Sequence, residues 1–484
     1  MAKKESLKES GVSIILNKIK LFTDSQDGYA AYEINGAKQT DRITGKQFKR
    51  YVQKILRDNN NSLNHSTLSE VISDIDAEAI YEGHRGEVFN RVGKDPDNNI
   101  IINPCFDNGN IIHITPEEWT IREPFTHSSK DKLKTYPIII KTKGMLSMPF
   151  PVRGHGNIQD IRRFIKAEND DNKFILIVAY IIQSFLFNGP FPIIVIVAEP
   201  GSGKTFTTLI IKNIIDPHEA PTLSIPRDPR DMFSTAGVSW VLAYDNFSKV
   251  QQWLSDLFCR FSTGNATIDR ELFTNGEAYI YSAKRPAIVN GISDFFSQSD
   301  VLQRSIIFEN NRITPEERKT EETLLNDFKK VLPGIFCDIL DLLSAVLKIL
   351  PDVNVSEPTR MSDFCKVGTA VGLSLGYDES FFMKAYNENQ KQANDITLDS
   401  SIIAPVIREL LSKEKESEFN GTPTELLDKL ESINPEAARS PYWPKTATVL
   451  SGHLKRLAQN FRDTGIIVET GRDSDGRWIR LKKL

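Results

Sequence analysis

The chain has 484 residues, with 60 Lys and Arg against 64 Asp and Glu, and a formal net charge of −4. This length allows about two to four domains, each with a hydrophobic core. The charge excludes a protein that binds nucleic acid through a general excess of positive charge, so any such binding must come from local patches.

The cysteines and the apolar segments predict a soluble protein of a reducing compartment. The cysteines lie far apart and show no C-x-x-C spacing, which argues against a zinc site and a disulfide scaffold. They are Cys105, Cys259, Cys337 and Cys365. The start MAKKES lacks the apolar core of a signal peptide, and the longest apolar run, 174–187, is too short to span a bilayer. We therefore expect a cytoplasmic protein with no membrane contact.

Residues 1–145 are predicted to form a small α+β domain. Helical periodicity covers 45–57 and 68–81, and short β-like segments lie at 88–92 and 99–102. No pattern in this domain predicts a specific chemistry. The Pro- and Gly-rich segment MPFPVRGHG that follows is typical of a linker, so we place a domain boundary before it.

The segment AEPGSGKT at 198–205 is the most specific motif of the chain. It follows the strand-like run 192–197 and precedes the helix-like run 206–215. At such a turn, glycines allow backbone N–H groups to face an anion, and the helix N-terminus adds a favourable dipole. We predict a phosphate-binding loop formed by Glu199, Pro200, Gly201, Ser202, Gly203, Lys204, Thr205 and Phe206.

Two residues of this loop are expected to contact ATP and Mg²⁺ directly. Lys204 would reach the β- and γ-phosphates, and the hydroxyl of Thr205 would bind Mg²⁺. Ala198 stands where the full pattern has Gly, which is a mild departure.

A second apolar strand is predicted at 238–244, and it ends in Asp245. A carboxylate at this place is the expected second ligand of Mg²⁺, so Asp245 is our Walker-B residue. The next residue is Asn246, where many NTPases have an acidic residue that polarises water. Because an amide cannot accept a proton, either hydrolysis is slow, or Asn246 holds the water while another carboxylate such as Glu199 is the base.

A third strand, 285–291, contains Asn290, which we predict to contact the γ-phosphate or the attacking water. The alternative is a plain turn asparagine.

Arg304 lies between an amphipathic turn and a new strand. Arginine binds phosphate oxygens bidentately, so Arg304 is the candidate arginine finger, acting across a subunit boundary, and Arg318 is the second choice. A surface salt bridge is the alternative for both.

The remaining chain divides into a helical lid and a C-terminal domain. We place the core at 146–312, the lid at 313–398 and a winged helix at 399–484. In the last domain, a helix opened by Thr446 or Thr448 precedes two strands around a DSDG turn. Trp443 and Trp478 are expected in its hydrophobic core.

Positive charge is concentrated at the end of the chain. Between Pro441 and Leu484, nine Lys or Arg stand against four acidic residues, a net charge of +5. This excess predicts nucleic-acid contact by the second helix and the wing. The residues are Lys455, Arg456, Arg472 and Arg477. A winged helix that contacts protein is the alternative.

The order of these motifs resembles the superfamily III helicase core of the AAA+ class, in the form found in poxvirus-type, phage and mobile-element ATPases. The resemblance runs from about residue 158 to the C-terminus. It rests on the phosphate loop, the strand before Asn246, the segment CRFSTGNATIDRELFTNGEAY, and the later RPAIVNG and LQRS. It implies an α/β P-loop NTPase core of the AAA+, superfamily III helicase type, between an α+β N-terminal region and a C-terminal winged helix.

The resemblance also implies an oligomeric ring, usually a hexamer, with ATP and Mg²⁺ between subunits and DNA threaded through the centre. Pore-facing cations would be Arg260, Arg270 and Lys284, in a polar stretch that predicts a protruding hairpin. A solvated surface loop is the alternative. The N-terminal region matches only weakly, and a docking site there for a separate primase is a hypothesis from the resemblance.

The leading functional hypothesis is an ATP-dependent DNA helicase or translocase that replicates a mobile element. Asn246 supports an alternative from another class, a nucleotide-switched DNA-binding initiator or regulator that turns over ATP slowly. A third hypothesis is a defence-type ATPase that acts on a protein partner. ATP hydrolysis that does not respond to DNA would favour this last class.

Overall fold

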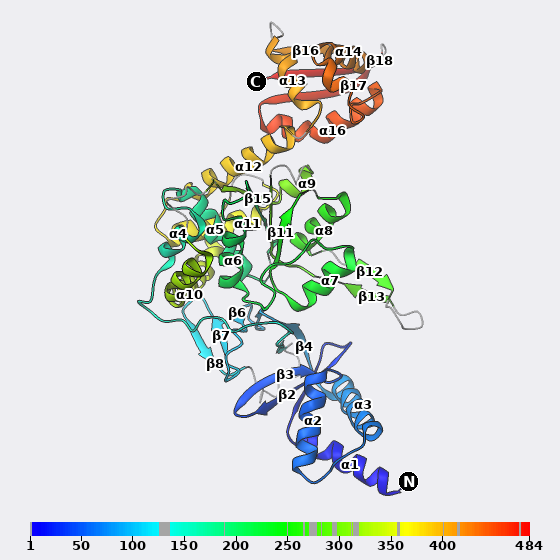
Figure 1. Ribbon diagram of the computed structural model, residues 1–484, viewed down its shortest axis with the longest axis vertical. Coiled ribbons are helices and arrows are strands. Elements are labelled where there is room, and N and C mark those ends of the chain that lie inside the picture. Colours follow the sequence, from blue (N-terminus) through cyan, green and yellow to red (C-terminus); the bar gives the residue numbers. More distant parts are fainter. Residues whose placement is uncertain are drawn as a thin grey trace.

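The structure is a computed structural model. It describes the backbone of residues 2–124, 136–187, 189–248, 250–264, 267–270, 278–281, 283–292, 298–310, 312, 319–355, 359–399, 401–413, 417–473 and 476–484. The molecule is elongated, with an N-terminal part at one end, a central α/β body, and a C-terminal part at the other end (Figure 1).

The N-terminal part is a five-stranded sheet covered by helices. Its elements are α1 (Ala2–Leu16), β1 (Lys20–Thr23), β2 (Gly28–Ile34), β3 (Ala37–Arg42), α2 (Lys46–Asp58), α3 (His65–Glu82), β4 (His84–Phe89) and β9 (Tyr136–Ile139), and the strand order is β3-β2-β1-β4-β9. Helix α2 buries Phe48, Tyr51, Val52 and Leu56, whose spacing of three or four residues places them on one face. These side chains share a core with α1 and α3. The sequence predicted α2 and α3 but not α1.

A second, antiparallel sheet joins the N-terminal part to the body. It has the order β5-β6-β7-β8, with β5 (Val92–Lys94), β6 (Ile100–Ile102), β7 (Ile111–Ile114) and β8 (Trp119–Arg122). Four of its buried isoleucines belong to the same hydrophobic cluster as α5 (Asp171–Ser184) and α10 (Glu321–Ile349), and these are Ile100, Ile102, Ile112 and Ile114. Residues from both sides of the predicted boundary at 145 therefore pack in one core.

The central body is built on a parallel sheet of order β11-β14-β10-β15. Its strands are β10 (Ile193–Ala198), β11 (Leu242–Phe247), β14 (Ala287–Gly291) and β15 (Ser305–Asn310). Strand β10 is a run of Ile and Val, as expected for a parallel strand buried on both faces. The mixed α/β fold with a parallel sheet is thus confirmed. Since the strands are parallel, their carboxyl ends and the loops that follow them lie along one edge.

Helices surround this sheet, and the sequence predicted the one after the phosphate loop and those of the lid, but not those between residues 229 and 263. The helices are α4 (Arg162–Ile165), α6 (Lys204–Ile215), α7 (Pro229–Val238), α8 (Gln252–Thr263), α9 (Ser299–Leu302), α11 (Ser362–Ser374) and α12 (Phe381–Asp399), with short 3₁₀ turns at Ile158–Ile161 and Leu350–Asp352. A hairpin of β12 (Thr267–Arg270) and β13 (Ala278–Tyr281) extends from the body, as predicted. Within the described ranges, no helix is both long and apolar enough to cross a bilayer.

One predicted strand begins later than expected. The sequence placed a strand at 238–244, but α7 continues through Val238 and β11 begins only at Leu242. The side chain of Asp228 accepts a hydrogen bond from the N–H of Asp231, and Pro229 occupies the first helical turn. These helix-start signals extend α7 into the apolar segment.

The C-terminal part follows α12, which leads out of the body (Figure 1). It contains α13 (Ala404–Lys413), β16 (Glu418–Gly421), α14 (Pro423–Ile433), α15 (Pro435–Ala438), α16 (Ala447–Asp463), β17 (Ile466–Asp473) and β18 (Gly476–Lys483), with the sheet order β16-β18-β17. The hydroxyl of Thr446 caps α16 by accepting from the N–H of Val449. Trp443 is 2% exposed and lies in the core of this part, as predicted, whereas Trp478 is half-buried.

Candidate functional site

The loop between β10 and α6 turns on two glycines in the left-handed conformation. Gly201 and Gly203 have φ values of +81° and +78°, a left-handed conformation that glycine adopts without steric cost. Gly203 is the N-cap of α6, and no side chain caps this helix. The first N–H groups of α6 therefore remain for a ligand or water. The hydroxyl of Ser202 is buried and has no hydrogen-bond partner among the described residues.

Two predicted metal ligands meet at this edge of the sheet. The hydroxyl of Thr205, in the first turn of α6, lies 3.2 Å from each carboxylate oxygen of Asp245 on β11. Hydroxyl and carboxylate oxygens are ligands that Mg²⁺ prefers. Lys204 is half-buried beside them, and its ammonium group forms no hydrogen bond or ion pair with the described residues.

The residue after Asp245 sits in a strained backbone position. The pairing of β11 with β14 shifts register between Tyr244 and Phe247, and Asn246 in this bulge has a φ of +65°. Asparagine tolerates this conformation much better than a longer acidic residue does. The bulge thus favours a short side chain such as Asn or Asp over Glu, and the exposed side chain of Asn246 leaves no carboxylate there.

Asn290 on β14 joins this bulge to α6. Its side-chain oxygen accepts the N–H of Asn246 at 3.0 Å, and its amide nitrogen donates to the hydroxyl of Thr208 at 2.9 Å. Asn290 is fully buried. Asn290 therefore connects α6, which carries Thr205, to β11, which carries Asp245.

Side chains that the sequence analysis missed support the loop from outside. The ammonium group of Lys166 donates to the carbonyl of Ser202 at 2.8 Å. Lys173 donates to the side-chain oxygen of Asn310 at 2.8 Å, and burial lowers the pKa of this lysine to about 8. Asn310 in turn donates to Thr207 on α6 at 3.2 Å. No local motif signals these residues, because their partners come from other elements.

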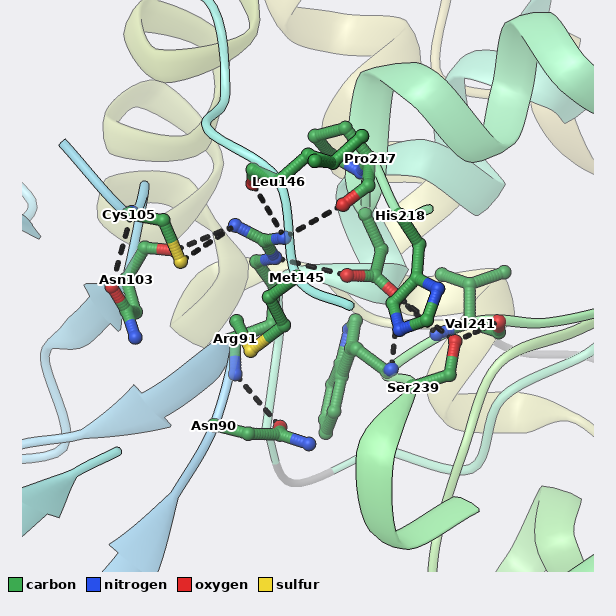
Figure 2. Close-up of polar contacts among 12 residues, drawn as sticks. Asn90, Arg91, Asn103, Cys105, Met145, Leu146, Pro217, His218, Ser239 and Val241 are labelled. Carbon is green, nitrogen blue, oxygen red and sulfur yellow. Dashed lines mark hydrogen bonds and ion pairs between the residues drawn. The ribbon is translucent and has the colours of Figure 1, made fainter. Parts of the chain in front are cut away.

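The far end of α6 is held by a fully buried charge cluster. Asp216 accepts from Arg91 at 3.0 Å and from Lys212 at 2.6 Å, and all three side chains are 0% exposed. Figure 2 shows Arg91 also reaching the carbonyl groups of Leu146 and Pro217. Burial alone would raise the pKa of Asp216, but the charges of Lys212 and Arg91 hold it well below its ordinary range. The cluster fixes α6 against the N-terminal part.

The same cluster reaches the start of the strand that carries Asp245. Lys212 donates to the hydroxyl of Ser239 and to the carbonyl of Val241, and Asp216 accepts the N–H groups of Trp240 and Val241. Both ends of α6 are thus tied to β11, through Thr205 at the loop and through Lys212 at the cluster.

Arg304 lies at the opposite edge of the sheet from the loop. Its carbonyl accepts the N–H of Ile193 at the amino end of β10. The six residues of β10 separate it from the loop by roughly 20 Å. Its side chain is 15% exposed and pairs with Asp300 at 2.7 Å, and Arg360 contacts the same carboxylate. The alternative interpretation of Arg304 was a salt bridge, and the ion pair with Asp300 agrees with that alternative. Arg318 lies outside the described residues.

The predicted nucleic-acid contacts fall in two places. Arg260 is exposed in the last turn of α8, and Lys284 is half-buried. The backbone of Arg270 belongs to β12, but its side chain lies outside the described residues. Exposed cations also lie on α16 and on the β17–β18 hairpin, and these are Lys455, Arg456, Arg472 and Arg477.

The β17–β18 hairpin places two positively charged residues side by side. Arg472 and Arg477 are directly opposite in the pairing of β17 with β18, next to the turn. Like charges at such a cross-strand pair are destabilising in the protein alone. A bound anion such as a phosphate would relieve this repulsion.

Comparison with known proteins gives two family matches. Residues 159–390 match the model of the actinomycete integrative conjugative element replication protein, and residues 403–484 match the AICE RepA C-terminal domain. No curated protein matches. Solved structures with some similarity include the apo NrS-1 C-terminal region, at 12% identity and a TM-score of 0.43 over 98% of both chains. Another is JCV helicase, at 14% identity and a TM-score of 0.22, over 45% of this chain and 64% of that chain.

Proposed function

Since residues 159–390 and 403–484 match family models of the replication proteins of actinomycete integrative conjugative elements, we propose that this protein is an ATP-dependent DNA helicase or translocase for such an element. The observation that carries the proposal is the meeting of Thr205 and Asp245 after a glycine turn, at the carboxyl edge of the parallel sheet. Ligands of open α/β sheets bind at this edge.

We assign the phosphates of ATP to the loop at 199–206. The free N–H groups at the start of α6 and the ammonium group of Lys204 stabilise the phosphate charge. Thr205 and Asp245 would hold Mg²⁺, which neutralises phosphate charge when bound. No group of three or more His, Cys, Asp or Glu in the described chain is arranged to hold a metal by itself. Phosphate and water would supply the other ligands of the ion, as is usual for Mg²⁺.

Asn246 favours one alternative, a nucleotide-switched initiator or regulator that assembles on DNA. The backbone bulge at Asn246 favours a short side chain over Glu, and the amide present there cannot remove a proton from water. Slow turnover would suit a protein that uses ATP as an assembly signal. The two functions differ in whether ATP hydrolysis separates DNA strands.

DNA contact is assigned first to the C-terminal part, as a winged helix. Lys455 and Arg456 present positive charge on α16, and Arg472 and Arg477 present it at the tip of the hairpin. Such cations bind the phosphate backbone and release counterions. In a ring, Arg260 and Arg270 are further candidates to face DNA at the centre.

Arg304 is proposed to act on the ATP of a neighbouring subunit. Within its own chain it lies across the sheet from Thr205, so it can contribute to hydrolysis only in trans. This requires a ring or filament in which one subunit's α9–β15 edge faces the next subunit's loop. Asp300 would release Arg304 when the neighbour's phosphates replace it as partner.

Mixing two inactive variants tests this arrangement. Arg304→Ala and Lys204→Ala subunits are each expected to hydrolyse little ATP. In an equal mixture, about one interface in four combines an intact Lys204 with an intact Arg304, so about a quarter of wild-type activity is expected. The measurement is phosphate release after subunit exchange, with assembly size followed by light scattering. Mixed assemblies of normal size without any recovery would contradict the role in trans.

A further inference from the structure

The outer face of α2 in the N-terminal part carries a stripe of positive charge. Its cations are spaced by three or four residues and lie on the side of the helix opposite the buried Phe48, Tyr51, Val52 and Leu56. They are Lys46, Lys49, Arg50, Lys54 and Arg57. All are exposed except Lys49, which is half-buried. We call this surface the α2 stripe.

The charge of the α2 stripe is not neutralised within the described chain. None of its five cations forms an ion pair with a described carboxylate, and Lys49 contacts only the ring of His65, at 3.4 Å. Helix α2 itself contains one acidic residue, Asp58, at its last position. The whole chain carries a net charge of −4, so the stripe does not reflect a general excess of Lys and Arg.

We propose that the α2 stripe binds the phosphate backbone of duplex DNA, as a second DNA-binding surface besides the C-terminal part. From Lys46 to Arg57 the stripe is about 16 Å long. Duplex DNA presents one negative charge per about 1.7 Å of its axis, so several phosphates fit along it. The aromatic residues of α2 are buried, so the stripe offers no platform for unstacked bases. It therefore suits the backbone of a duplex and carries no sequence preference.

A second copy of the chain fits the stripe less well. On the neighbouring α3, Glu78 and Glu82 are exposed and form no ion pair with a described residue, but they are four residues apart and span only about 6 Å of a stripe about 16 Å long. A match to more of the stripe would also need Asp74, which pairs with Lys8 at 2.8 Å, and Glu70, which accepts from the hydroxyl of Ser66 at 3.3 Å. An interface between α2 of one copy and α3 of another would have to break these contacts. Duplex DNA requires no such exchange.

The test compares two triple variants of the full-length protein. Lys46→Gln/Arg50→Gln/Lys54→Gln removes three charges from the α2 stripe. The matched control, Lys329→Gln/Lys348→Gln/Lys384→Gln, removes three exposed charges from α10 and α12. Binding of a labelled random-sequence duplex is measured by fluorescence anisotropy across a salt series. The stripe variant is expected to bind at least about tenfold more weakly near 0.1 M salt, with a salt slope smaller by about 2–3.

The outcomes separate this proposal from its alternatives. The control variant is expected to stay within about twofold of wild type, and both variants keep their melting temperature because all the substituted side chains point to solvent. Duplex affinity of the stripe variant equal to that of the control would overturn the proposal. Unchanged duplex affinity with lost self-association in sedimentation velocity would also overturn it and assign the stripe to a contact between copies.

The test of DNA binding by the α2 stripe does not depend on the nucleotide site. DNA binding is measured without ATP, and the stripe variant is expected to retain basal ATP hydrolysis, because α2 does not touch the loop at 199–206. Combining the stripe variant with Arg472→Gln/Arg477→Gln should weaken binding by about the product of the two separate effects. A combined effect no larger than that of the hairpin variant alone would contradict two separate surfaces.

Discussion

ATP hydrolysis by a Lys204→Ala variant is expected to fall at least about a hundredfold below that of wild type. The ammonium group of Lys204 is the one cation of the loop itself, and no described residue neutralises it. Its loss removes positive charge from the place where charge develops on the transferred phosphate. The measurement is steady-state phosphate release at saturating ATP and Mg²⁺.

A matched substitution controls for the loss of a lysine. Lys348→Ala removes an exposed cation from the last turn of α10, away from the loop, and is expected to leave hydrolysis unchanged. Asp245→Asn should resemble Lys204→Ala, because it removes the carboxylate beside Thr205. A Lys204→Ala protein that keeps more than half of wild-type turnover would show that the loop is not the hydrolytic site.

Asp216→Asn is expected to destabilise the protein by about 3–5 kcal/mol, because it leaves Arg91 and Lys212 buried without a counter-charge. In a body of this size the loss corresponds to a melting temperature lower by roughly 6–20 °C. Differential scanning calorimetry measures it. The matched control is Asp341→Asn, which weakens a half-exposed pair with Arg153 but keeps an oxygen that can accept the ring N–H of Trp119, and should cost less than about 1 kcal/mol. Equal shifts for both variants would contradict a structural role for the buried cluster.

Wild type and Asp216→Asn should also differ in how their stability depends on pH, and the pKa shift of Asp216 gives the direction of this difference. The folded pKa of Asp216 lies below that of the unfolded chain, so its contribution is complete above about pH 4 and is lost only as the pH falls through the folded pKa. The difference in melting temperature between wild type and Asp216→Asn should therefore not shrink as the pH falls from about 8 to 5, and it widens where Lys212, whose pKa burial lowers, gains a proton in the variant. A difference that shrinks within this range would mean that Asp216 is not ionised in the folded protein.

The parts of the site that depend on local sequence lie where the sequence predicted them. The turn of Gly201 and Gly203 joins β10 to α6, because left-handed glycines followed by helix-forming residues determine this geometry locally. The strand before Asp245 was harder to predict, because Val238 continues the apolar run yet belongs to α7. Local helix-start signals at Asp228 and Pro229 outweigh the apolar pattern there.

The parts that depend on tertiary contacts were not predictable. Arg91 binds Asp216, 125 positions later in the chain, and appeared in the sequence only as the end of a short β-like segment. Lys166 reaches the carbonyl of Ser202 from the end of α4, where it adopts a left-handed conformation that no motif signals. The ion pair of Arg304 with Asp300 is local in sequence, but its position across the sheet from Thr205 follows only from the strand pairing.

Strand displacement on a forked DNA substrate tests the central claim most directly. Wild-type protein with ATP and Mg²⁺ should release the labelled strand, whereas Lys204→Ala protein, or wild-type protein with a non-hydrolysable ATP analogue, should not. Release that persists in Lys204→Ala would contradict the assignment of the loop at 199–206. ATP-dependent assembly on the fork without any strand release would contradict the helicase and support the initiator.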